Sequence, residues 1–235
     1  MPQGFSKYVP PVVECLARNY DGFNPVPLNR VRACLVALGR GGTGEVYSGL
    51  KYAAKLGYVE EVPYGKFVRF RPTLTGVVKG AIMDAVMAAL GIMNEKAIDI
   101  TEHMSIILGS YLLLDLPDTI LVALHGTKGI ECICCTEDGG CFGYKRIEGR
   151  DRVYLGMIAL KVLAGVEVRG VRPRDYWLLF SFVRDEALFY LRRGFKGLDP
   201  EAAARTSPLV VLFLLKLGRN WFLPKYKAVQ QALGH

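Results

Sequence analysis

Hydrophobic positions near the start of the chain follow a helical spacing in three successive stretches. The first spans residues 11–20 and the second spans 28–38, and a glycine after each favours the end of a helix. The third begins at Thr43, whose hydroxyl is suited to cap the first turn. Its predicted inward positions are Val46, Leu50, Ala53 and Leu56. The pattern therefore predicts three amphipathic helices before residue 57.

A strand-like alternation replaces the helical spacing after Gly57. Residues 59–62 and 66–70 alternate on either side of Pro63-Tyr64-Gly65, which predicts a hairpin. Residues 74–90 return to a helical pattern, rich in Ala, Val and Met. The predicted inner positions of this helix are Val77, Ile82, Val86 and Leu90. It is either the last helix of an N-terminal domain or a dimerisation helix.

Polar and cationic side chains gather on the outer face of the third predicted helix and on the hairpin. Hydrogen-bonding and basic side chains along one helix face suit the major groove of DNA. Basic residues on a neighbouring hairpin are suited to contact phosphates. The predicted DNA-binding residues are Thr43, Ser48, Lys51, Tyr52, Lys55, Lys66, Arg69 and Arg71.

Residues 49–60, the hairpin and residues 70–76 resemble the recognition helix, the wing and the "LT…G" exit of MarR- and PadR-like winged-helix regulators. The resemblance covers the N-terminal part of the chain only. It departs at Pro72-Thr73, where that family runs straight from the strand into Leu-Thr, and at the glycines before the recognition helix. It implies a winged helix-turn-helix and a regulator that binds double-stranded DNA, which we expect to act as a homodimer. Winged helices also bind proteins, so a protein partner is the alternative.

The chain changes character near Leu90-Gly91, which predicts two domains, 1–91 and 92–235. In the second part, strands are predicted at 119–124, 130–135 and 141–147, and helices at 98–116, 152–164, 173–193 and 200–217. The expected fold class is α+β: an N-terminal winged helix-turn-helix followed by a mostly helical domain with a small three-stranded sheet. We expect the second domain to serve dimerisation, ligand binding or partner binding.

Four cysteines lie close together in the predicted sheet: Cys132, Cys134, Cys135 and Cys141. Alternate strand residues point to opposite faces, and the two-residue gaps typical of metal sites are absent, so no metal or cofactor is favoured. Three readings stay open: buried apolar side chains, a Cys135–Cys141 disulfide, and a zinc or iron–sulfur site. Cys15 and Cys34 fall on inward helix faces and are expected in the core.

Composition narrows the classes of protein further. The chain has 235 residues, of which 51% are hydrophobic, enough for one large or two small domains. No apolar run approaches the about 18 residues of a membrane helix, and no signal-peptide pattern is present, so a soluble cytoplasmic protein is expected. A net charge of +8 favours polyanionic partners. The scarcity of Asn and Gln is typical of thermophiles.

No arrangement typical of catalysis stands out, so the chain is not expected to be an enzyme. Residues 38–47 resemble a kinase glycine-rich loop, but helical spacing on both sides contradicts the two strands that such a loop joins. Two other functions compete with DNA binding. One is an interaction subunit of a transcription or repair assembly that holds a metal or iron–sulfur cluster through its cysteines. The other is an enzyme whose C-terminal sheet binds a ligand around His125 and the cysteines.

Overall fold

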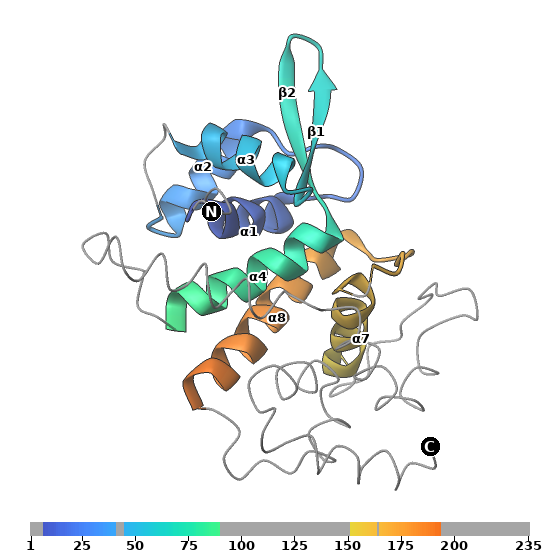
Figure 1. Cartoon of the computed structure of the whole chain (residues 1–235). Coiled ribbons are helices and arrows are strands. Elements are labelled where there is room, and N and C mark those ends of the chain that lie inside the picture. Colours follow the sequence, from blue (N-terminus) through green and yellow to red (C-terminus); the bar gives the residue numbers. More distant parts are fainter. Residues whose placement is uncertain (1–6, 41–44, 90–150, 164, 194–235) are drawn as a thin grey trace, which may run out of the picture. The chain divides into compact units, whose positions relative to one another are not determined.

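The computed structural model describes residues 7–40, 45–89, 151–163 and 165–193 (Figure 1). These residues form six helices and a two-stranded antiparallel sheet, which confirms an α+β protein that is mostly helical. The predicted three-stranded sheet and the predicted helices at 98–116 and 200–217 lie outside them. Within the described part of the chain, no helix has both the length and the apolar character needed to cross a bilayer.

The described residues divide into two compact units. Residues 7–40, 45–89 and 172–184 belong to the first, and residues 151–163, 165–171 and 185–193 belong to the second. The predicted boundary near Leu90-Gly91 lies outside the described residues and stays a prediction.

Helix α1 (Val9–Asn19) is the centre of the first unit. Its first turn carries Pro10 and Pro11, which are tolerated there because the first amides of a helix have no intrahelical acceptor. Every residue from Val9 to Ala17 is buried, and α1 contacts α2 (Leu28–Ala37), α3 (Glu45–Lys55) and α4 (Leu74–Ala89). The three helices predicted before residue 57 are therefore present, with α2 and α3 packed on α1.

One of the four positions predicted to face inward on α3 is not buried. Val46, Leu50 and Ala53 are buried as predicted, but Leu56 is 38% exposed. The prediction for Leu56 is wrong because α3 ends at Lys55 and Gly57 adopts a φ of 71°, which turns the chain into the hairpin.

Strands β1 (Val59–Tyr64) and β2 (Phe67–Pro72) form the predicted hairpin, which extends away from the helices in Figure 1. Tyr64 pairs with Phe67, so the turn consists of Gly65 and Lys66 rather than the predicted Pro63-Tyr64-Gly65. Gly65 has a φ of 59°, the left-handed conformation that tight hairpins require. The base of the hairpin is anchored by the fully buried Phe70.

The segment between α1 and α2 also pairs with this hairpin. The backbone amide of Val26 donates to the Phe70 carbonyl at 2.7 Å, and the Phe70 amide donates back at 3.3 Å. An extended residue far upstream in the sequence thus joins the edge of β2 and ties the helices to the hairpin.

Thr73 connects the hairpin to α4. Its hydroxyl accepts a hydrogen bond from the Gly76 amide at 2.9 Å and lies 2.9 Å from the Gly57 carbonyl, to which it can donate. Position 76 has no room for a side chain, because a Cβ there would lie 2.0 Å from the Tyr58 carbonyl oxygen. Thr73, one of the two residues at which the sequence departs from the MarR/PadR pattern, therefore caps the first turn of α4.

Helix α4 is buried on almost every side, including the predicted inner positions Val77, Ile82 and Val86. Leu90 lies outside the described residues. The two roles predicted for this helix, last helix of the N-terminal domain or dimerisation helix, both stay predictions.

Helices α7 (Asp151–Leu163) and α8 (Pro173–Arg193) confirm two further predicted helices. The first part of α8 packs on α1: Trp177 accepts the Arg18 guanidinium over its ring at 3.5 Å, and Tyr176 meets Tyr20 edge-to-face at 5.1 Å. Residues 172–184 are thus part of the N-terminal unit, although the sequence assigned them to the second domain.

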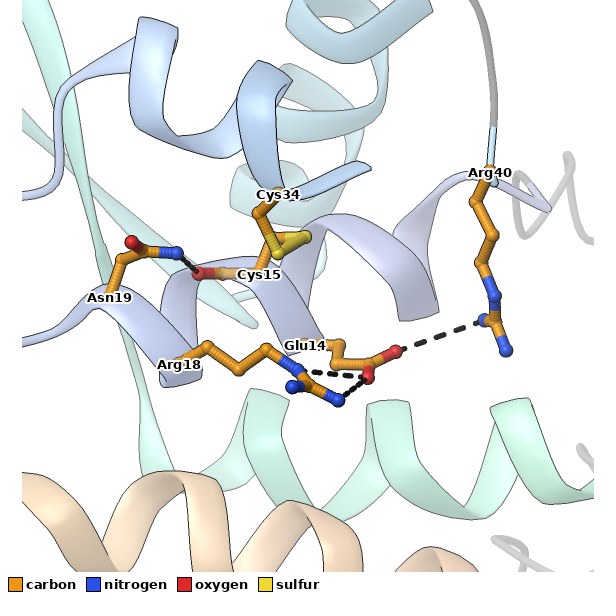
Figure 2. The surroundings of a disulfide bond; sticks show 6 residues. All are labelled: Glu14, Cys15, Arg18, Asn19, Cys34 and Arg40. Carbon is orange, nitrogen blue, oxygen red and sulfur yellow. Dashed lines mark hydrogen bonds and ion pairs between the residues drawn. A yellow bond between two sulfur atoms is a disulfide. The ribbon is translucent and has the colours of Figure 1, made fainter. Parts of the chain in front are cut away.

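Two buried carboxylates hold this unit together. Asp84 of α4 has no exposed surface and forms ion pairs with Arg40, after α2, and with Arg184 of α8. Glu14 of α1 is bound by Arg18 at 2.8 Å and lies 3.9 Å from Arg40, as Figure 2 shows. A buried carboxylate is tolerated only when cations and hydrogen bonds compensate for the lost water, so these arginines are structural.

A disulfide joins α1 to α2 through Cys15 and Cys34 (Figure 2). Cys15 has no exposed surface, as predicted for a core residue, whereas Cys34 is half-buried. The bond itself was not predicted, because two cysteines 19 residues apart on separate amphipathic helices resemble ordinary core residues.

Candidate nucleic-acid interface

The outer face of α3 carries four of the eight side chains predicted to contact DNA. Ser48 and Lys55 are exposed, while Lys51 and Tyr52 are half-buried. Thr43 lies outside the described residues. The helix therefore presents a hydroxyl and a cation to solvent near opposite ends, with a second cation between them.

Lys51 is not a free cation, because it forms an ion pair with Glu61 of β1. Its Nζ lies 2.5 Å from the Glu61 carboxylate and 5.7 Å from the centre of the Tyr47 ring. The hydrogen bond to Glu61 is the main cause of a raised pKa for Lys51. Glu61 thus offsets part of the positive charge and holds the lysine between helix and hairpin. No spacing in the sequence signals this pair, since its members lie on different elements.

A ring contact also joins α3 to the hairpin. Tyr47 packs edge-to-face against Phe70, with ring centres 6.3 Å apart. Tyr47 is 42% exposed, whereas Phe70 has no exposed surface. Together with the Lys51–Glu61 pair, this contact places the outer face of α3 and one face of the hairpin side by side.

The three predicted cations of the hairpin have different surroundings. Lys66 is exposed in the turn. The Arg69 guanidinium lies 3.4 Å from the centre of the Tyr64 ring, and Arg71 is 3.5 Å from the Glu60 carboxylate. Stacking leaves the charge of Arg69 uncompensated, whereas the charge of Arg71 is opposed by a carboxylate. Lys66 is therefore the cation best placed to approach a phosphate.

The turn of the hairpin is flanked by two aromatic side chains that the sequence reasoning did not select. Tyr64 is 50% exposed and Phe67 is 75% exposed. They are direct partners across the two strands, so both project from the same face next to Lys66. An aromatic residue on each side of a hairpin glycine was the signal available in the sequence.

The residues predicted to bind a metal or a ligand belong to the part of the sequence between α4 and α7. Cys132, Cys134, Cys135, Cys141 and His125 all lie outside the described residues, so the disulfide, zinc and iron–sulfur readings stay predictions. Over residues 7–40, 45–89, 151–163 and 165–193, no three His, Cys, Asp or Glu side chains come together in a way that would hold a metal ion.

Comparisons of the chain with protein-family models, with curated proteins and with solved structures find no match.

Proposed function

We propose that residues 7–89 form a winged helix-turn-helix that binds double-stranded DNA, and that the protein regulates transcription as a homodimer. The order of elements supports this: three helices, a hairpin and a return into a helix. The backbone pairing of Val26 with Phe70 ties the segment between α1 and α2 to the hairpin, which holds the hairpin beside the helices. In this reading α3 is the recognition helix and the β1–β2 hairpin is the wing.

The observation that carries the proposal is the ion pair between Lys51 and Glu61. It joins the predicted recognition helix to the first strand of the wing at 2.5 Å. A duplex that accepted α3 in its major groove would therefore meet the wing at the same time. Specific contacts would come from Ser48 and Lys55, and phosphate contacts from the wing.

Charge reversal on α3 tests this arrangement. We expect the Lys51→Glu/Lys55→Glu double variant to lose duplex binding, because two cations on one helix face become anions. The thermal midpoint should fall only slightly, because Lys55 is exposed and the partly exposed Lys51–Glu61 pair, which the variant breaks, contributes less than about 1 kcal/mol. Fluorescence anisotropy with labelled duplexes at several salt concentrations measures the affinity. Unaltered affinity in the double variant would exclude α3 as the DNA-reading helix.

A matched control separates this site from net charge alone. Lys55→Glu and Arg169→Glu change the charge by the same amount, and Arg169 lies outside α3 and the hairpin, with a 74% exposed side chain. We expect only the Lys55 variant to weaken binding strongly. Equal losses in both variants would show that binding depends on overall charge.

The wing makes a separate, sequence-independent contribution in this proposal. Lys66→Ala should weaken binding to all duplexes alike and reduce the salt slope by about one. Arg71→Ala should have a smaller effect, because Glu60 already opposes that charge. A loss confined to one preferred sequence in the Lys66 variant would show that the wing reads bases.

A second candidate is a winged-helix module that binds a protein. Glu60 and Glu61 oppose two of the predicted cations, and Val36 on α2 is 64% exposed, which suits a mixed polar and apolar partner surface. Absence of salt-dependent duplex binding by the full chain would favour this candidate.

A further inference from the structure

The tip of the hairpin combines an exposed apolar ring with positive charge. Among the described large apolar residues, only Phe23, at 82%, is more exposed than Phe67, at 75%. The turn between Tyr64 and Phe67 contains just Gly65 and Lys66, so Phe67 stands at the very end of a short, hydrogen-bonded element. Tyr64, its direct partner on the other strand, is 50% exposed, so the tip carries two neighbouring aromatic side chains rather than one isolated exposed ring.

Charge is distributed unevenly along the hairpin. The carboxylates Glu60 and Glu61 lie toward the base, where they face Arg71 and Lys51. The tip carries Lys66 and the nearby Arg69, and neither has a carboxylate partner among the described residues. The charged residues described beside Phe67 are thus all cations, which favours a polyanionic partner at the tip over a neutral protein surface.

The two aromatic residues of the tip are not equivalent. The Arg69 guanidinium covers one face of the Tyr64 ring, at 3.4 Å from its centre. Phe67 has no such stacking partner among the described residues and is the more exposed of the two. Phe is also one of the side chains that minor-groove proteins insert between base pairs.

The reach of the hairpin fits a contact one groove away from α3. Each strand has six residues, so the tip stands about 17 Å from the base at the usual rise per strand residue. That is about half of one turn of B-DNA. A wing anchored beside a helix in the major groove is therefore long enough to span the distance to the neighbouring minor groove.

We propose that Phe67 inserts between two base pairs from the minor groove and kinks the bound duplex, while Lys66 contacts the adjacent phosphates. This inference rests on the DNA binding proposed above. Insertion unstacks one base step, which costs least at pyrimidine–purine steps such as TA and CA. The preferred partner is therefore a duplex that carries a flexible step about half a helical turn from the sequence read by α3.

The test uses the full chain and duplexes that carry 2-aminopurine next to a TA step and a fluorophore pair at the two ends. Binding of the wild-type chain should raise the 2-aminopurine emission, because unstacking removes quenching, and should bring the ends closer. Phe67→Ala should abolish both signals and weaken binding about tenfold. Phe67→Leu should retain both, because Leu is also a wedge side chain.

Two controls separate insertion from general effects. Phe23→Ala is the same substitution at a similarly exposed ring outside the hairpin, and it should leave affinity and both signals unchanged. Lys66→Ala should weaken binding but keep the unstacking signal, because the wedge is still present.

The outcomes distinguish this inference from the proposed function. Tight duplex binding without unstacking or bending, equal in wild type and Phe67→Ala, would overturn insertion and leave DNA binding standing. No duplex binding at any salt concentration would overturn both. A smaller oligomer for Phe67→Ala in sedimentation, again without unstacking by the wild type, would show that Phe67 contacts a second copy of the chain.

Discussion

Pro173, at the start of α8, fills the space that a side chain on Gly22 would need. A Cβ at position 22 would lie 2.1 Å from Cγ of Pro173, and Gly22 has a φ of 93°. Position 22 follows α1, so this contact fixes the beginning of α8 against the loop after α1. Glycine is required there for two separate reasons, its backbone conformation and the proximity of the proline.

Gly22→Ala should therefore destabilise the protein by about 3 kcal/mol. Gly39→Ala is the matched control, because Gly39 also has a positive φ, 65°, but a Cβ there would meet nothing within 4 Å. We expect the control to cost about 1 kcal/mol, the backbone effect alone. Urea unfolding of both variants measures the difference, and adding Pro173→Ala to Gly22→Ala should recover part of it. Equal costs at positions 22 and 39 would mean that Pro173 does not pack on the loop.

The second prediction concerns the buried carboxylate of Asp84. Asp84→Asn keeps the size of the side chain but removes the buried negative charge that pairs with Arg40 and Arg184, so we expect a loss of about 3 kcal/mol in unfolding free energy. Glu61→Gln removes the partially exposed pair with Lys51 and should cost less than about 1 kcal/mol. Denaturant unfolding compares the two, and a similar small cost for both would show that the Asp84 pairs are solvated.

A third prediction follows from the disulfide between α1 and α2. Removing it by Cys34→Ser should lower the unfolding free energy by about 3 kcal/mol, because the unfolded chain regains the freedom of a closed loop. A reducing agent should lower the thermal midpoint of the wild type and leave that of the Cys34→Ser variant much less affected. Alkylation of the non-reduced protein followed by mass spectrometry should find Cys15 and Cys34 protected together. Free alkylation of both would show that the bond does not form in solution.

A fourth prediction concerns acid stability. The side chain and the backbone amide of Asn24, together with the Phe23 amide, donate hydrogen bonds to Asp21 and lower its pKa from 3.8 to about 2. Since the folded pKa is the lower one, ionised Asp21 stabilises the fold above pH 3.8, and this stabilisation is lost as the pH falls toward 2. Asp21→Asn should therefore flatten the fall in stability over that interval, as measured by urea unfolding at successive pH values. An unchanged pH profile would show that this turn is open in solution.

The sequence predicted those parts of the fold that depend on local patterns. Helical spacing located α1, α2, α3, α4, α7 and α8, and strand alternation around Gly65 located the hairpin. Leu56 was misplaced because its apolar character continues the spacing of α3, whereas the left-handed Gly57 ends the helix one residue earlier. The spacing of apolar side chains does not show at which residue the helix ends.

Contacts between residues far apart in the chain were not predicted from the sequence. Lys51 was expected to be free for DNA, because nothing in the local sequence shows that Glu61 on the next element pairs with it. The Cys15–Cys34 bond and the membership of residues 172–184 in the N-terminal unit were missed for the same reason. Hydrophobic spacing shows which face of a helix is buried but not which other segment covers it.

Because the first part of α8 packs on α1, the N-terminal unit can finish folding only after α8 has been synthesised. The ion pair between Asp84 and Arg184 spans 100 residues, so α4 leaves the ribosome long before its partner exists. At a synthesis rate of about 10 residues per second, Arg184 is synthesised about ten seconds after Asp84. During that interval the surface of α1 and α4 that α8 later covers is open to solvent and to chaperones. A nascent chain arrested before residue 172 should therefore be more sensitive to protease in its first helices than one arrested well beyond residue 193.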